Sequence, residues 1–184
     1  MNSFLFLNFI KDEVGITTMS LTTILLLLVS TIGAIYDWRA RRIPNWLTFG
    51  SLAVIFPLNI FHLGVYGFVN SLLGLFAGLA LLFIPYIIGG MGAGDVKLLG
   101  TLGAITGYKG AIIIFFYTAV CGLILSIIWL LFNPSRLKFL ITTGQVLPAI
   151  DKKQKIPYGI AILLGTILYI MFGAGNLLNL IIWQ

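Results

Sequence analysis

Long apolar runs, separated by short charged or glycine-rich stretches, are the feature that most restricts how this chain folds. An α-helix needs about 17 to 25 apolar residues to cross the hydrocarbon core of a bilayer, which is about 30 Å thick. Only 9% of the residues are charged and the mean hydropathy is +1.10, whereas soluble domains carry about a quarter charged residues. We therefore expect an all-α, polytopic transmembrane helix bundle of about six spans, with candidate helices at 19–36, 46–65, 68–88, 94–108, 111–132 and 158–183.

Two of these runs need argument. In the fourth, only 96–107 is free of charge, which corresponds to about 18 Å of helix and is short for the hydrocarbon core. If this run crosses, all of the eleven basic residues except Lys11 and Lys109 share one face. The positive-inside rule favours that arrangement, with the shared face cytoplasmic and the N-terminus outside. The sixth run contains Gly173, Ala174 and Gly175, and we interpret it as one tilted or kinked span.

The nine basic residues assigned to the cytoplasmic face lie in short segments between the spans. They are Arg39, Arg41, Arg42, Lys97, Arg136, Lys138, Lys152, Lys153 and Lys155. The net charge of +6 is explained by membrane orientation, so we do not expect nucleic-acid binding.

The N-terminal stretch is apolar from Met1 to Ile10, but it lacks the basic region and the cleavage site of a signal peptide. It suits an interfacial helix. Met19 precedes the first convincing span and is an alternative start of translation. We divide the chain into an N-terminal extension, 1–18, and a membrane-embedded domain, 19–184.

Several chemistries find little support in the residues. Cys121 is the single cysteine, which excludes an intramolecular disulfide and a Cys-based zinc site. His62 is the single histidine and follows the second span, so it belongs to the outer face, away from any cytoplasmic nucleophile. A serine nucleophile activated by lysine finds little support, because Ser135 and Lys138 lie in an ordinary basic loop. The sequence contains neither a P-loop nor an HExxH motif, and we expect no metal and no cofactor.

Five acidic residues are present, and two of them stand out. Asp12 and Glu13 belong to the face opposite the cytoplasmic one. Asp151 precedes two lysines in a polar loop, which is typical of a solvated surface charge. Asp37 and Asp95 remain. Two spans separate them, so both belong to the same face, and acids at membrane depth are candidates for function.

Each of these two acids also has an ordinary structural explanation. Asp37 follows the first span, and Pro44 and Asn45 suit the stop and the N-cap that start the second span. Asp95 suits an N-cap of the fourth helix. However, the segment Gly92-Ala93-Gly94 places little side chain beside Asp95, so an extended substrate backbone can approach there.

Two neighbouring carboxyl groups suffice to hydrolyse a peptide without a metal. One activates water as a base and the other polarises the carbonyl as an acid, and the pair shares one proton. A non-enzymatic alternative is a small proton-coupled transporter in which Asp37 and Asp95 titrate during transport.

The residues around both acids resemble a known family. Asp37 with Arg39-Ala40-Arg41-Arg42-Ile43-Pro44-Asn45, then Gly92-Ala93-Gly94-Asp95-Val96-Lys97, and later Lys155-Ile156-Pro157-Tyr158-Gly159, are similar to the type IV prepilin peptidases. These are GxGD-type intramembrane aspartyl proteases. The resemblance covers roughly Met19 to Phe172.

The resemblance implies a multi-pass enzyme of the cytoplasmic (inner) membrane that removes the short basic leader of prepilin-like proteins on the cytoplasmic side. It implies Asp37 and Asp95 as catalytic acids, with Gly92 and Gly94 shaping the site. Five neighbours are expected to support the motifs: Arg39, Arg42, Pro44, Asn45 and Lys97. The implied partners are prepilin-like substrates and the lipid bilayer.

The chain departs from larger members of that family, which insert a cytoplasmic domain after the first span, often with paired CxxC zinc motifs, and also methylate the new N-terminus. Here about ten residues separate Asp37 from the second span. This favours a compact, peptidase-only type that serves Flp-like or related pili. Tyr36-Asp37 and Gly92-Ala93-Gly94-Asp95 are also similar to presenilin and signal peptide peptidase, which cut within a transmembrane helix.

Overall fold

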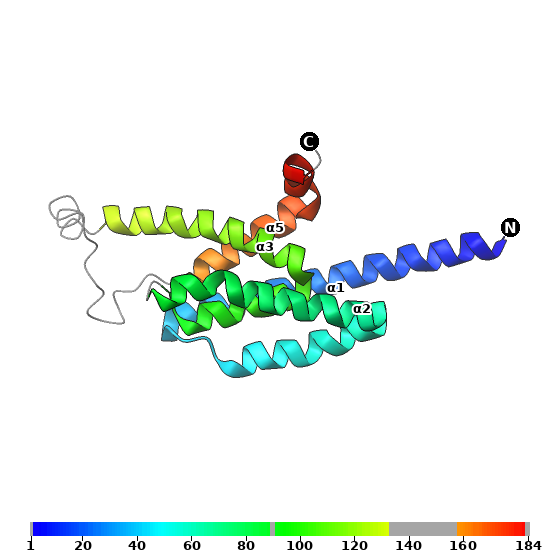
Figure 1. Ribbon diagram of the computed structural model, residues 1–184, viewed down its shortest axis with the longest axis horizontal. Helices are drawn as coiled ribbons and strands as arrows, with labels where there is room; N and C mark the ends of the chain where they lie inside the picture. The colour runs from blue at the N-terminus through cyan, green and yellow to red at the C-terminus, as the bar shows by residue number, and fades with distance from the viewer. Residues whose placement is uncertain (1, 89–90, 133–157, 183–184) are drawn as a thin grey trace.

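The computed structural model describes residues 2–88, 91–132 and 158–182, and for 2–20 and 173–182 it describes the backbone alone. Within these ranges the chain is all helical, as predicted. The helices are α1 (Asn2–Ala40), α2 (Asn45–Ile87), α3 (Ala93–Leu131) and α5 (Tyr158–Ile182), shown in Figure 1. Three stretches are long and apolar enough to cross a membrane, Leu21–Ala40, Asn45–Ile87 and Ala93–Leu131, and Tyr158–Phe172 is a shorter apolar helix.

Helix α2 folds back on itself at Gly64. The backbone there is non-helical, with φ 63° and ψ −149°. Across this break, Asn59 donates a hydrogen bond to Ser71, and the rings of Phe56 and Phe68 lie 5.4 Å apart between centroids. Residues twelve positions apart are about 18 Å apart in a straight helix, so the chain must reverse. Glycine adopts the positive φ without the clash that a Cβ atom causes.

Helix α3 folds back in the same way at Gly107, where φ is 76° and ψ is 178°. A Cβ atom at Gly107 would collide with the amide of Asn70, and one at Gly103 would lie 3.0 Å from the Cβ of Ala111 on the returning segment. In Figure 1, α2 and α3 each appear as a hairpin of two helical segments. The boundaries predicted between 65 and 68 and between 108 and 111 lie within a few residues of these two reversals.

Two local expectations are corrected. The first helix does not run from 19 to 36, because α1 begins at Asn2 and continues to Ala40. Asn45 is not the N-cap of the second helix, since Pro44 occupies that position with φ −70° and ψ 140°. The fixed φ of proline suits this extended cap, and Asn45 becomes the first helical residue.

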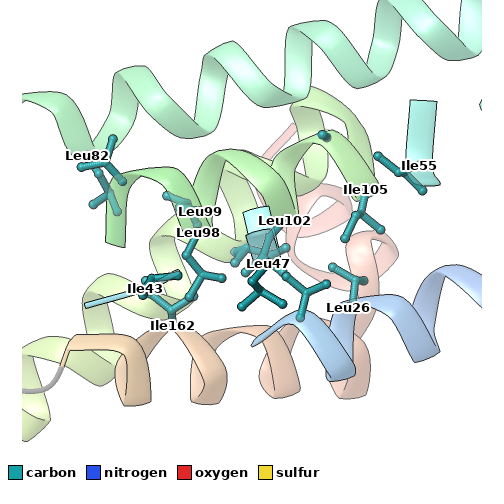
Figure 2. Packing of buried hydrophobic residues seen from close by; sticks show 14 residues of the cluster. Leu26, Ile43, Leu47, Ile55, Leu82, Leu98, Leu99, Leu102, Ile105 and Ile162 are labelled. Atoms are coloured by element: carbon teal, nitrogen blue, oxygen red, sulfur yellow. The ribbon is translucent and has the colours of Figure 1, made fainter. Parts of the chain in front are cut away.

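The first segment of α3, residues 93–106, lies at the centre of the bundle. It packs against α2, α5 and α1. Figure 2 shows Leu98, Leu99 and Leu102 of this segment between Leu82 of α2 on one side and α1 and α5 on the other. All four of these leucines are fully buried, so the start of α3 is held on several sides.

Close contact between α2 and α3 depends on small residues. A Cβ atom at Gly74 would collide with the carbonyl oxygen of Gly103, and one at Gly78 would lie 2.6 Å from the carbonyl oxygen of Leu99. Small residues of this kind allow helix backbones to approach in a membrane, where packing drives association. The second segment of α2 therefore supports the segment of α3 that carries Asp95.

Several residues singled out in the sequence lie outside the described residues. They are Met1, Ser135, Arg136, Lys138, Asp151, Lys152, Lys153, Lys155, Ile156 and Pro157.

Candidate active site

Asp37 lies in the last turn of α1 and is held by the first turn of α5. The main-chain N–H of Gly159 donates a hydrogen bond of 2.8 Å to Oδ2 of Asp37. The first N–H groups of a helix lack partners within that helix, and the N-terminal end of a helix favours negative charge. A carboxylate at the start of α5 is therefore well placed, although the Asp37 side chain is only 8% exposed.

The contact between Gly159 and Asp37 leaves no space for a side chain. A Cβ atom at Gly159 would lie 2.8 Å from the Cβ of Asp37 and 3.1 Å from its Oδ2. It would also lie 3.3 Å from the Cα of Ala34, one turn earlier in α1. Glycine at 159 is thus required for the carboxylate to reach the main chain of α5.

Asp95 lies in the first turn of α3 and is bound by its own helix. Its Oδ2 accepts a hydrogen bond of 3.2 Å from the main-chain N–H of Gly92, and its N–H donates to the Gly92 carbonyl at 3.1 Å. Gly92, with φ −84° and ψ 149°, is the N-cap. The interpretation of Asp95 as the N-cap is therefore wrong, since it is the third helical residue and its side chain reaches back to the cap.

The second carboxyl oxygen of Asp95 is in an unusual position. Oδ1 is buried and has no hydrogen-bond partner among the described residues. The Asp95 side chain as a whole is 6% exposed. A buried polar atom without a partner is costly, and such atoms occur where a proton, water or ligand is needed.

Asp37 at the end of α1 and Asp95 at the start of α3 are both buried on the same part of the bundle. They are close enough for their charges to act on each other. Two buried neighbouring carboxylates strongly disfavour double ionisation, so such a pair is suited to hold one shared proton. The structure thus brings together the two aspartates that the sequence placed on one face.

The connection between α1 and α2 lies over the turn that carries Asp95. A Cβ atom at Gly94 would lie 3.2 Å from both the Cβ and the main-chain N of Ile43. At Gly92 the nearest atom would be Oδ2 of Asp95, at 3.3 Å. Gly92 and Ala93 are both exposed. The main chain beside Asp95 is therefore open on one side and covered by Ile43 on the other.

The remaining predicted residues divide into two groups. Lys97 donates a hydrogen bond of 3.2 Å from Nζ to Oδ1 of Asn45, which links α3 to the start of α2. Pro44 caps α2 beside this link. Arg39 and Arg42 are exposed and lie in the last turn of α1 and in the following loop.

The family model of the type IV leader peptidase family matches residues 24–127. This stretch is more than half of the 184 residues and contains both aspartates and the glycines beside Asp95. The chain belongs to the type IV leader peptidase family. No curated protein and no solved structure matches it. The resemblance noted in the sequence is confirmed, and a family of peptidases together with long apolar helices supports a membrane peptidase.

In this member of the leader peptidase family, the structure adds three residues to the site that the sequence did not assign to it. Gly159 binds Asp37 through its main chain. Tyr158, half-buried at the start of α5, is close enough to Asp95 for the charge of that carboxylate to act on its hydroxyl group. Arg41 is half-buried, and its charge acts on Asp37. The sequence held a signal for the first two, because they belong to the third motif that resembles the family.

The described part of this family member holds no group of three or more His, Cys, Asp or Glu side chains that suits a metal ion. Cys121 is a buried free thiol within α3, as expected of a packing residue.

Proposed function

We propose that this member of the type IV leader peptidase family is an aspartyl endopeptidase that removes the leader of prepilin-like precursors. The observation that carries the proposal is the buried pair of Asp37 and Asp95, in which Oδ1 of Asp95 has no partner among the described residues. The pair lies beside exposed main chain at Gly92 and Ala93. A substrate backbone in extended form can bind along such a segment.

The proposed reaction needs one proton on the pair. The ionised carboxylate takes a proton from water, which attacks the scissile carbonyl, while the protonated acid gives its proton to the carbonyl oxygen. The resulting gem-diol intermediate then collapses and the C–N bond breaks. The first carboxyl gives its proton to the leaving amine, and one hydroxyl of the diol returns a proton to the second carboxylate, so the pair again holds one proton. Either acid can hold the proton at the start, because the pair titrates as a unit.

We further propose six membrane crossings, made by α1, the two segments of α2, the two segments of α3, and α5. Segment 93–106 is about 21 Å long, which is short for a bilayer. Asp95, at the start of this segment, would therefore lie at or just below the membrane surface. Trp38 and Trp46 support this depth, since they are 67% and 60% exposed beside the site and tryptophan favours the membrane interface.

The cytoplasmic side is proposed from the distribution of charge. Four basic residues gather around the ends of the helices that carry the acids: Arg39, Arg41, Arg42 and Lys97. Lys109 lies just after the reversal of α3, at the opposite end of that segment. The positive-inside rule then places Asp37 and Asp95 at the cytoplasmic face, with the N-terminus outside.

The compact type is proposed from the length of one connection. Only Arg41–Pro44 join α1 to α2, so no further domain is inserted between them. We assign 19–184 as the membrane-embedded peptidase domain and 1–18 as an extension, although α1 continues through the boundary. We propose peptidase activity alone, without N-methylation.

The test is cleavage by the purified chain in liposomes with a type IV prepilin-like precursor, with products identified by mass spectrometry. We expect a single cut at the junction between the leader and the hydrophobic helix. A cut inside the transmembrane helix would instead indicate a presenilin-like protease. Proton flux without any cleavage would indicate a transporter and overturn the proposal.

A further inference from the structure

Arg41 has a backbone conformation that side-chain-bearing residues seldom adopt. Its φ is 52°, and it is the one non-glycine residue with positive φ in the described part of the chain. Helices often end in this left-handed conformation, but the residue is then usually glycine, because a Cβ atom makes it unfavourable. Such strained residues gather at functional sites.

Arg41 directly follows α1, one helical turn after Asp37. The main-chain N–H of Arg41 donates a 2.9 Å hydrogen bond to the carbonyl oxygen of Asp37. The side chain is half-buried and its positive charge acts on the Asp37 carboxylate. Arg39 and Arg42, on either side, are exposed. Of the three arginines, Arg41 is thus the one that is half-buried and whose charge acts on Asp37.

The pair needs such a charge for a physical reason. Burial and mutual repulsion both favour the fully protonated pair, which has no base to activate water. The described groups that act on the Asp37 carboxylate are the Gly159 N–H from α5 and the charge of Arg41 from the loop. Asp37 and Asp95 act on each other, and the Asp95 charge also acts on Tyr158. Within this set, Arg41 carries the only positive charge.

We propose that Arg41 is a positioning residue whose charge keeps the Asp37–Asp95 pair singly ionised at neutral pH, and whose left-handed backbone holds that charge in place. This inference rests on the proposed aspartyl mechanism. Arg41 would act through Asp37 and would not touch the reacting atoms.

The test uses three substitutions that separate charge from backbone. Arg41→Gly and Arg41→Asn both remove the charge and accept the left-handed conformation. Arg41→Lys keeps the charge. Lys109→Asn, an exposed position at the opposite end of the α3 segment, is the control for loss of one positive charge. The readout is the rate of leader cleavage against pH in liposomes of neutral lipid.

We expect the acidic limb of the profile to move up by about one pH unit in the Gly and Asn variants, so that cleavage on that limb is about tenfold slower. In Arg41→Lys and Lys109→Asn, the acidic limb should stay at the same pH as in the unchanged enzyme. A limb that stays in place in the Gly and Asn variants overturns the inference. So does an equal loss at every pH in all three Arg41 variants, since that is the mark of a purely structural role.

Asp37→Asn is measured in the same series, which separates this inference from the proposed function. If that variant still cleaves, the aspartyl mechanism itself is wrong. If it is inactive while the Arg41 variants keep the profile of the unchanged enzyme, only the role of Arg41 is wrong.

Discussion

The main-chain N–H of Gly159 donates a 2.8 Å hydrogen bond to Oδ2 of Asp37, across 122 positions of the chain. The two acids are thus held in different ways, because Asp95 is bound by Gly92 of its own helix while Asp37 is bound by another helix. The geometry of the site therefore depends on how α5 docks against α1, and this dependence leads to the first prediction.

Gly159→Ala is expected to lower leader cleavage about a hundredfold, because the added methyl would lie 2.8 Å from the Cβ of Asp37 and displace the carboxylate. The measurement is the initial rate in liposomes with a prepilin-like precursor. Helix content, followed by circular dichroism, should change little.

Gly50→Ala is the matched control for that substitution. Gly50 lies inside α2, and a Cβ atom there meets nothing within 4 Å. We expect unchanged cleavage and a stability gain of up to about 1 kcal/mol from helix propensity. Equal losses from both alanines would show that Gly159 has no particular role at Asp37.

Gly107→Ala should destabilise the reversal of α3. The residue has φ 76°, and its Cβ atom would collide with Asn70. The left-handed conformation alone costs about 1 to 2 kcal/mol for a residue with a side chain. The free energy of unfolding in detergent micelles should fall by at least that amount. An unchanged free energy of unfolding, or a gain like that expected for Gly50→Ala, would contradict the account.

The link between Lys97 and Asn45 is expected to contribute little. The two side chains are exposed and their hydrogen bond is 3.2 Å long. A double-mutant cycle with Lys97→Met and Asn45→Ala should give a coupling energy below about 1 kcal/mol in the free energy of unfolding. A coupling of several kcal/mol would mean that the link holds the site together.

The rate of cleavage should pass through a maximum as pH changes. At low pH both carboxyl groups are protonated and no base remains, and at high pH both are ionised and no acid remains. The measurement is single-turnover cleavage across the pH range in which the protein stays folded. A rate that is flat over that range would contradict a shared proton.

Much of the arrangement could be predicted because the bilayer imposes simple rules. Charges and glycines between apolar runs placed the reversals near Gly64 and Gly107, and the even number of runs between Asp37 and Asp95 placed both acids on one face. These are local features of composition, and in a membrane they determine where helices end and which face a loop lies on.

Other features depend on contacts that the order of residues does not contain. The bond from Gly159 to Asp37 depends on the docking of α5, and no local sequence signal marks the left-handed conformation of Arg41 after the end of α1. Asn45 looked like an N-cap because its side chain suits that role, but Pro44 fits the cap and the Asn45 amide binds Lys97 instead.

The central claim is that Asp37 and Asp95 act together, and the most direct measurement is leader cleavage by Asp37→Asn and Asp95→Asn in liposomes. Asp12→Asn serves as the control, since Asp12 lies about 38 Å earlier along α1. The account predicts that each of the first two folded variants loses at least about a thousandfold in rate while the control keeps full activity. Efficient leader removal by either folded variant would contradict it.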